Sequence, residues 1–100
     1  MNYFVGEIGR PILLSTNLDW SSAVTKTIIV TCPDSSTFSL TEGEVVVGDP
    51  VNGHIHFLTR DGDLTLPGLY IAQAKLTTET SVLYSPLISF VVDAPLVEEG

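Results

Sequence analysis

Two histidines are the residues of this sequence best suited to metal chemistry. His54 and His56 alternate in "GHIHFL", so both imidazoles would project from the same face of a strand, about 7 Å apart. Two ligands do not hold zinc, which takes three or four. A further ligand would have to be a carboxylate or come from other copies of the chain, as in a trimer. We expect no metal site, and name His54 and His56 as the candidates if one exists.

The aspartates, the cysteine and the serines of the sequence also lack the spacing of known calcium-binding or catalytic motifs. Asp61 and Asp63 in "DGD" offer oxygen ligands, but the calcium-binding loop that ends in a glutamate is missing, so we expect a plain turn. The single cysteine, Cys32, ends the apolar run "TIIVTC", which favours core packing over a reactive thiol. The sequence has no G-x-S-x-G, no H-E-x-x-H and no glycine-rich phosphate loop. We therefore expect no catalytic residues, no cofactor and no enzymatic activity.

Short strands must position these side chains. Val, Ile, Thr, Leu, Phe and Tyr recur in short runs, and turn residues interrupt them about every ten positions. Helical periodicity is hard to find. The pattern predicts an all-β fold of about seven or eight strands, near residues 3–7, 11–16, 24–32, 37–40, 44–47, 53–59, 69–78 and 83–92.

Alternation within the strands predicts how they pack. Tyr70, Ala72 and Ala74 would share one face of their strand, and the other expected strands also have one consistently apolar face. Two antiparallel sheets packed face to face bury such faces economically. We expect residues 1–95 to form a single immunoglobulin-like β-sandwich and residues 96–100 to form an acidic tail.

The stretch "DGDLTLPGLY" indicates a specific corner of such a sandwich. Immunoglobulin-like domains often place a tyrosine at the start of the strand that follows the corner between the sheets, with its hydroxyl bonded to upstream backbone. Pro67 and Gly68 would turn the chain, and Tyr70 would bury its ring and anchor the corner. The alternative interpretation is an ordinary core tyrosine.

Charge excludes two classes of partner. Four basic residues against twelve acidic ones give a net charge of −8 and a sequence pI of about 4.3. Phosphate backbones and anionic membrane surfaces attract lysine and arginine, which this chain hardly offers. No stretch approaches the roughly 20 apolar residues of a membrane helix. We expect neither nucleic acid nor membrane as a partner.

Apolar residues also fall on the faces expected to meet solvent. Neighbouring exposed apolar side chains usually mark contact with another chain, whereas scattered ones are ordinary. We interpret the set as a partner interface; scattered exposure or a misassigned register is the alternative. The residues are Ile29, Leu58, Leu69, Ile71 and Val91.

Three stretches carry a resemblance to a known family: "KTIIVTCPDSSTFSL", "GHIHFLTRDGDLTLPGLYIAQAKL" and "PLISFVVDAP". Across residues 6–94 the chain resembles the N-terminal domain of phage baseplate upper proteins and related small immunoglobulin-like modules of bacteriophage virions. The matching residues are Pro33 and Asp34, then Gly53, Ile55 and Phe57, then Asp63 and Leu64, then Pro67, Gly68 and Tyr70, and finally Phe90 and Val92.

The resemblance implies a non-enzymatic structural or accessory protein of the virion. The family's domain usually opens a longer chain, whereas this sequence ends at Gly100. Besides a baseplate component, we therefore expect that the chain could be a free-standing accessory of the virion, such as a capsid decoration protein or a small tail component. The implied partners are other virion proteins and further copies of the chain, in a trimer, a higher oligomer or a symmetric array. The implied location is the virion, after assembly in the cytoplasm of the bacterial host. No catalytic residues transfer from the family.

A carbohydrate- or cell-surface-binding module is the alternative function. Such a site would need exposed aromatic and polar side chains, for which Tyr3, Trp20, Tyr84 and His56 are the candidates. Trp20 lies in the loop-like stretch "NLDWSS", and we expect it to fill the core instead.

Overall fold

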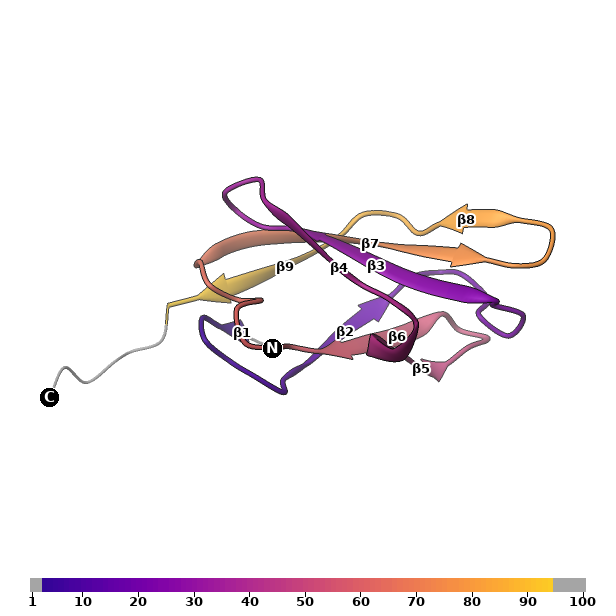
Figure 1. Cartoon of the computed structure of the whole chain (residues 1–100), viewed down its shortest axis with the longest axis horizontal. Helices are drawn as coiled ribbons and strands as arrows, with labels where there is room; N and C mark the ends of the chain where they lie inside the picture. Colours follow the sequence, from indigo (N-terminus) through magenta and orange to yellow (C-terminus); the bar gives the residue numbers. More distant parts are fainter. Residues whose placement is uncertain (1–2, 95–100) are drawn as a thin grey trace, which may run out of the picture.

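The computed structural model describes residues 3–94, and these form nine strands and one short 3₁₀ helix. The strands lie in two sheets that pack face to face (Figure 1). Sheet A has the order β1-β9-β7-β3-β4 with β8 also paired to β7, and sheet B has the order β2-β6-β5. The elements are β1 (Tyr3–Phe4), β2 (Pro11–Ser15), β3 (Thr25–Thr31), β4 (Thr37–Leu40), η1 (Glu42–Glu44), β5 (Val45–Asp49), β6 (His54–Leu58), β7 (Gly68–Thr77), β8 (Val82–Tyr84) and β9 (Ile88–Asp93).

This architecture confirms the predicted all-β sandwich and corrects three details. The last expected strand divides into β8 and β9 because Pro86 has no N–H to donate and the Ser85 hydroxyl bonds the Ala74 N–H instead. The first expected strand is shorter, since Gly6 at φ +88° turns the chain after β1. The pairing of β1 with β9 is parallel, whereas the other ladders between residues 3 and 94 are antiparallel.

Two of the sequence expectations concern the chain's end and membranes. The expected acidic tail, residues 96–100, lies outside the described residues. Between residues 3 and 94, no helix is long and apolar enough to cross a membrane.

The core fills the space between the sheets with the side chains that alternate inward. On β7 every second residue from Tyr70 to Leu76 is buried, and from sheet B the inward residues of β2 and β6 meet them. Ala72 and Ala74 are small, which leaves room for bulkier neighbours such as Phe57. Burying each large aliphatic or aromatic side chain contributes about 1.5–3 kcal/mol.

Trp20 lies in this core, as the sequence suggested, and joins a small buried polar cluster. Its indole Nε1 donates a hydrogen bond to Thr16 Oγ1 at 2.8 Å. The Thr16 hydroxyl donates in turn to the Gly53 carbonyl at 2.8 Å, which the Thr16 N–H also reaches at 2.9 Å. The cluster therefore ties the end of β2 to the turn that precedes β6.

The corner before β7 has the geometry of a tyrosine corner. The Tyr70 hydroxyl donates to the Leu66 carbonyl at 2.8 Å and accepts from the Leu66 N–H at 3.3 Å. The ring is fully buried and stacks on Phe90 with 5.3 Å between the centroids. Gly68 has φ +136°, and a Cβ there would come within 3.0 Å of the Pro33 side chain, so glycine suits this turn.

Replacing Tyr70 by phenylalanine should lower the free energy of unfolding by about 1 kcal/mol at neutral pH, because two corner hydrogen bonds disappear.

The corner also makes the stability of the domain depend on pH, because burial raises the pKa of the Tyr70 phenol. The folded chain resists ionisation that the unfolded chain allows above about pH 10, so stability falls as pH rises from there through the folded-state pKa. Urea unfolding between neutral and alkaline pH should show a shallower alkaline decline in Tyr70→Phe. Tyr84→Phe, which changes an exposed ring, should behave as wild type; equal declines in both variants would contradict the role of the corner.

Candidate docking surface

An oblique row of apolar side chains crosses the outer face of sheet A. On β7, Leu69 and Ile71 point outward, and Leu69 lies directly opposite Val91 of β9. Ile29 of β3 lies diagonal to Ile71, because Ile71 pairs with the residue two positions further along β3. Phe4 of β1 extends the row beyond β9, where it pairs with the residue that follows Val92. We call these five residues the apolar stripe.

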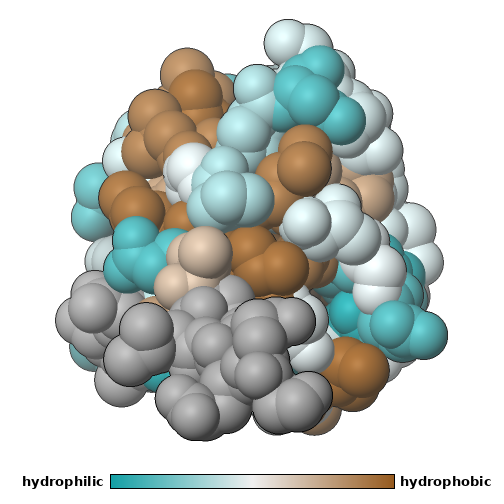
Figure 2. All heavy atoms as spheres, turned by 90° about the vertical axis from the view of Figure 1, so that its left-hand side faces the viewer, coloured by the Kyte–Doolittle hydropathy of each residue, from teal (hydrophilic) through white to brown (hydrophobic). Residues whose placement is uncertain are grey.

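The stripe is accessible to solvent in the isolated domain. Leu69 and Val91 expose 51% and 54% of their surface, Ile29 exposes 39%, and Ile71 is half-buried. The end-on view of Figure 2 shows hydrophobic side chains reaching the surface at the end of the molecule where β7 begins and β9 ends. Adjoining exposed aliphatic side chains on several strands are typical of surfaces that contact another protein.

Mostly neutral side chains surround the stripe, with Asp93 as a charged neighbour directly opposite Phe4. Among the outward-facing residues of the described strands of sheet A, only Lys75 and Asp93 carry charge, and their charges cancel. The other outward positions around the stripe hold hydroxyl and amide groups: Thr25, Thr27, Thr31, Thr37, Ser39, Gln73, Thr77 and Ser89. A broad neutral face stands out in a chain whose net charge is −8, and it suits contact with a protein rather than with an ion.

Leu58 does not belong to this surface, which corrects the single patch that the sequence suggested. It points outward from β6, and β6 pairs with β2 and β5 in sheet B. Leu58 is exposed there beside Leu13 and Val46, which flank His56 from the two neighbouring strands. Alternation predicted that Leu58 faces outward but could not say which sheet it belongs to.

Three of the exposed apolar residues that went unnoticed in the sequence lie beside the named ones on the outer faces of the sheets. Phe4, Leu13 and Val46 each alternate with a buried neighbour in a short strand. The same alternation that marked Leu69 would have found them, had it been applied to strands of two to five residues.

His54 and His56 both project from the outer face of β6, as their alternation predicts. Asp49 pairs with His54 across the ladder to β5, but its carboxylate accepts hydrogen bonds from Asn52, with the side-chain amide at 2.8 Å. These bonds from Asn52, helped by the nearby His54, lower the pKa of Asp49. Within residues 3–94, no three His, Cys, Asp or Glu side chains gather in a way that would hold a metal ion.

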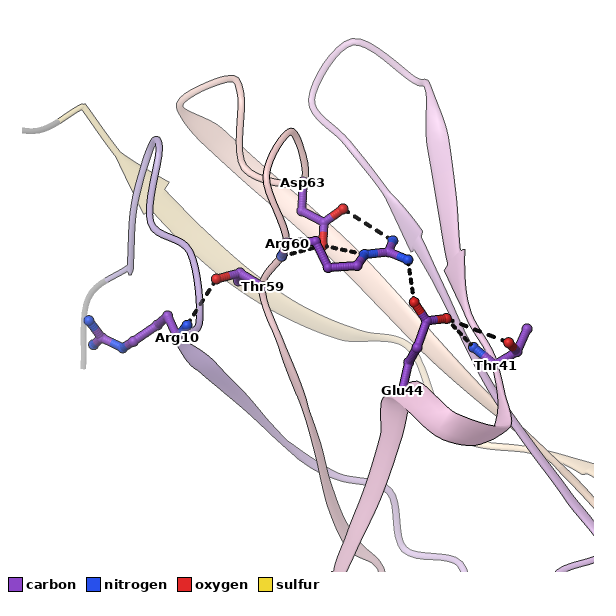
Figure 3. A network of polar contacts seen from close by, with 6 residues as sticks. All are labelled: Arg10, Thr41, Glu44, Thr59, Arg60 and Asp63. Atoms are coloured by element: carbon purple, nitrogen blue, oxygen red, sulfur yellow. Dashed lines mark hydrogen bonds and ion pairs between the residues drawn. The ribbon is translucent and has the colours of Figure 1, made fainter.

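Asp63 of the "DGD" turn is bound by arginine (Figure 3). Its carboxylate accepts from Arg60 Nε at 3.0 Å, from Nη2 at 3.1 Å and from the Arg60 backbone N–H at 2.9 Å. Arg60 Nη1 reaches Glu44 of η1 at 2.6 Å, and the guanidinium lies 5.8 Å from the ring centroid of Phe38. Asp63, and then Glu44, raise the pKa of Arg60. The network therefore serves to hold η1 and β4 against the corner that follows β6.

Glu44 also anchors its own helical turn in this network. Its carboxylate accepts from the Thr41 N–H at 3.1 Å (Figure 3). That bond, followed by the interaction with Arg60, lowers the pKa of Glu44.

Cys32, which directly follows β3, is half-buried and packs against the hydrophobic core.

The four residues of the alternative carbohydrate site do not come together. Tyr3 and Trp20 are buried in the core. Tyr84 is exposed on the outer side of sheet A, whereas His56 lies on the outer side of sheet B. No pair of these side chains flanks a common binding surface.

The chain matches no protein-family model and no curated protein. What the domain does is therefore inferred from its surface and from its sequence motifs.

Proposed function

We propose that this domain is a non-enzymatic structural or accessory protein of a bacteriophage virion, a component of the tail, the baseplate or the capsid decoration. It docks onto neighbouring virion proteins through the apolar stripe. The stripe, which five side chains on four neighbouring strands form, is the observation that carries the docking role. The resemblance to phage immunoglobulin-like modules supports the virion as the location, reached after assembly in the bacterial cytoplasm.

The size of the stripe bears on how it binds. Burying the exposed half of an aliphatic side chain contributes about 1 kcal/mol, so the stripe contributes roughly 5 kcal/mol. Immobilising a free partner costs about 4–15 kcal/mol, which a single stripe does not offset. Repeated contacts in a trimer, a higher oligomer or a symmetric array raise the effective concentration and make such a weak site sufficient. The proposal therefore includes several copies per particle.

The acidic residues have a complementary role. Twelve acidic residues against four basic ones give the chain a net charge of −8, and Asp93 is the one acidic residue among the outward positions of the described strands of sheet A. Like charges keep copies apart except where a neutral face or edge allows contact. Docking is thereby directed to weakly charged faces such as the one that carries the stripe.

Replacing Leu69 and Ile71 together by serine should reduce incorporation into particles about 30-fold, because two apolar contacts worth about 1 kcal/mol each are lost. The chain is supplied in trans to a phage that lacks its own copy, and the amount that copurifies with virions is measured by mass spectrometry. The control is Ile8→Ser with Val51→Ser, which removes two exposed apolar side chains from loops outside the stripe.

The control variant should be incorporated as well as wild type. Equal incorporation of the stripe variant and the control would remove the stripe from the docking role. Absence of the wild-type chain from purified virions would contradict the virion assignment itself.

A further inference from the structure

A free sheet edge in this domain is unusually apolar. β8 pairs with β7 on one side, and none of the other described strands lies on its other side (Figure 1). Its three residues, Val82, Leu83 and Tyr84, are all exposed. Natural proteins usually protect free edges with charged residues, prolines or bulges, or keep the edge strand very short. β8 is short, with three residues, but it contains no charged residue, proline or bulge.

The edges of sheet B have such protection. β2 begins with Pro11, and β5 carries a bulge between Val47 and Asp49. In sheet A, the edge strand β4 also lacks charge, proline and bulge, but its outward side chains are the hydroxyl-bearing Thr37 and Ser39. β8 differs from these edges because all three of its side chains are large and exposed.

The hydrogen bonds around β8 identify which backbone groups remain open. The backbone N–H of Ser85 donates to the Ala74 carbonyl at 2.9 Å, and the backbone N–H of Thr78 donates to the Ser81 carbonyl at 2.8 Å. Bonded and non-bonded pairs alternate in an antiparallel ladder, so Leu83 is the residue of β8 that bonds β7. Val82 and Tyr84 direct their N–H and C=O groups toward the free edge.

We infer that β8 pairs with β8 of a second copy of this chain, antiparallel, about a two-fold axis at Leu83. This register places Val82 of each copy opposite Tyr84 of the other. Each such pair is a hydrogen-bonded pair of the antiparallel ladder, in which the two residues exchange two backbone N–H···O bonds. Leu83 meets its own copy in the non-bonded pair, where side chains lie closest. On the outer face, each Val82 side chain packs beside the tyrosine ring of the other copy.

Self-complementarity and charge favour a second copy as the occupant. The open backbone groups flank Leu83 symmetrically, so the strand fits itself without a register shift. Repulsion between chains of net charge −8 opposes most contacts between copies, but β8 carries no charge and Lys75 is the one charged residue opposite it. Glu79, the acidic residue closest in sequence, lies in the turn before β8. Pro86 lacks an N–H and ends the pairing soon after Tyr84.

A contact of this length is weak. Three residues from each copy bury less than the roughly 800 Å² per partner of a standard interface, so association should be evident only at high concentration. The inference does not depend on the apolar stripe. β8 pairs with the last residues of β7, from Lys75 to Thr77, whereas the stripe residues of β7 lie in its first half, which pairs with β9. A failure of one therefore leaves the other intact.

Val82→Pro tests the pairing because it removes an N–H that β7 does not use. Sedimentation velocity from about 10 µM to about 1 mM spans the range expected of a weak dimer. The wild-type sedimentation coefficient should rise with concentration, and that of Val82→Pro should stay at the monomer value. Ser39→Pro is the matched control. The Cys32 N–H donates to the Ser36 carbonyl, so every second residue from Ser36 onward bonds β3, and the Ser39 N–H points to the free edge of β4 as the Val82 N–H does on β8. It should associate as wild type does.

Two further measurements decide the outcome if Val82→Pro fails to fold. Leu83→Lys keeps every N–H but places two ammonium groups opposite each other, and it should abolish the dimer. Amide hydrogen exchange at Val82 and Tyr84 in wild type should slow as concentration rises, whereas exchange at Ser39 should not change. A wild-type monomer at about 1 mM would overturn the inference. A dimer that persists in Leu83→Lys, or that forms without protection at Val82 and Tyr84, would do the same.

Discussion

Replacing Gly53 by alanine is expected to destabilise the domain by about 4 kcal/mol. Gly53 has φ +77°, and a Cβ at this position would lie 2.6 Å from the Leu18 carbonyl oxygen and 2.9 Å from the Leu18 nitrogen. Both are backbone atoms, which cannot rotate away as a side chain can. Relief of the clash would separate Gly53 from Thr16, whose hydroxyl and N–H both bond the Gly53 carbonyl.

Gly62→Ala is the matched control for this experiment. Gly62 has a similar φ of +90°, but a Cβ there would meet nothing within 4 Å. Alanine at Gly62 should therefore cost only the backbone strain, about 1 kcal/mol. Urea unfolding followed by Trp20 fluorescence measures both variants, and Trp20 reports directly on the cluster around Thr16. Equal losses of stability at the two positions would contradict the close packing of Gly53 against Leu18.

Replacing Arg60 by leucine is expected to lower the free energy of unfolding by about 2–3 kcal/mol. The Asp63 side chain is 7% exposed and would lose both guanidinium bonds, keeping only the bond from the backbone N–H. The bond to Glu44 would vanish as well. Arg60 is itself 41% exposed, so water can replace part of what is lost, and the effect stays below that of a fully buried pair.

A double-mutant cycle separates the unpaired carboxylate from the other effects of losing Arg60. Asp63→Leu combined with Arg60→Leu removes both charges, so the double variant should be more stable than the sum of the two single losses predicts, by about 1–2 kcal/mol. Chemical denaturation at neutral pH provides all four values. Strict additivity would show that Arg60 and Asp63 do not depend on each other, contrary to the geometry in Figure 3.

Local patterns in the sequence were sufficient to predict most of the fold. The inward positions of β7 follow from alternation alone, because a strand turns every second side chain to the same face. The Tyr70 corner follows from residue types whose backbone preferences act over a few positions. These features depend on neighbours in the chain, which a single sequence displays directly.

The features that could not be predicted depend on contacts between distant segments. Leu58 was assigned the correct face but the wrong surface, since nothing near it in the chain states that β6 joins sheet B. The parallel pairing of β1 with β9 joins opposite ends of the chain. Arg60 binds Glu44 across 16 positions of sequence, and neither residue stands out alone.

The candidate docking surface shows the same division. Ile29, Leu69, Ile71 and Val91 were recognised as outward-facing, yet their arrangement as one oblique row required the register between strands. The neutrality of the face also appears only once the strands are placed side by side, because the acidic residues are dispersed along the sequence.

Hydroxyl-radical labelling of aliphatic side chains, read by mass spectrometry, tests the proposed docking most directly. The isolated domain should be labelled at Leu69, Ile71 and Val91, and the same residues should be protected when the chain is part of purified virions. Ile8 and Val51 should be labelled equally in both preparations, since they lie outside the stripe. Unchanged labelling of Leu69, Ile71 and Val91 in particles that contain the chain would contradict docking through this face.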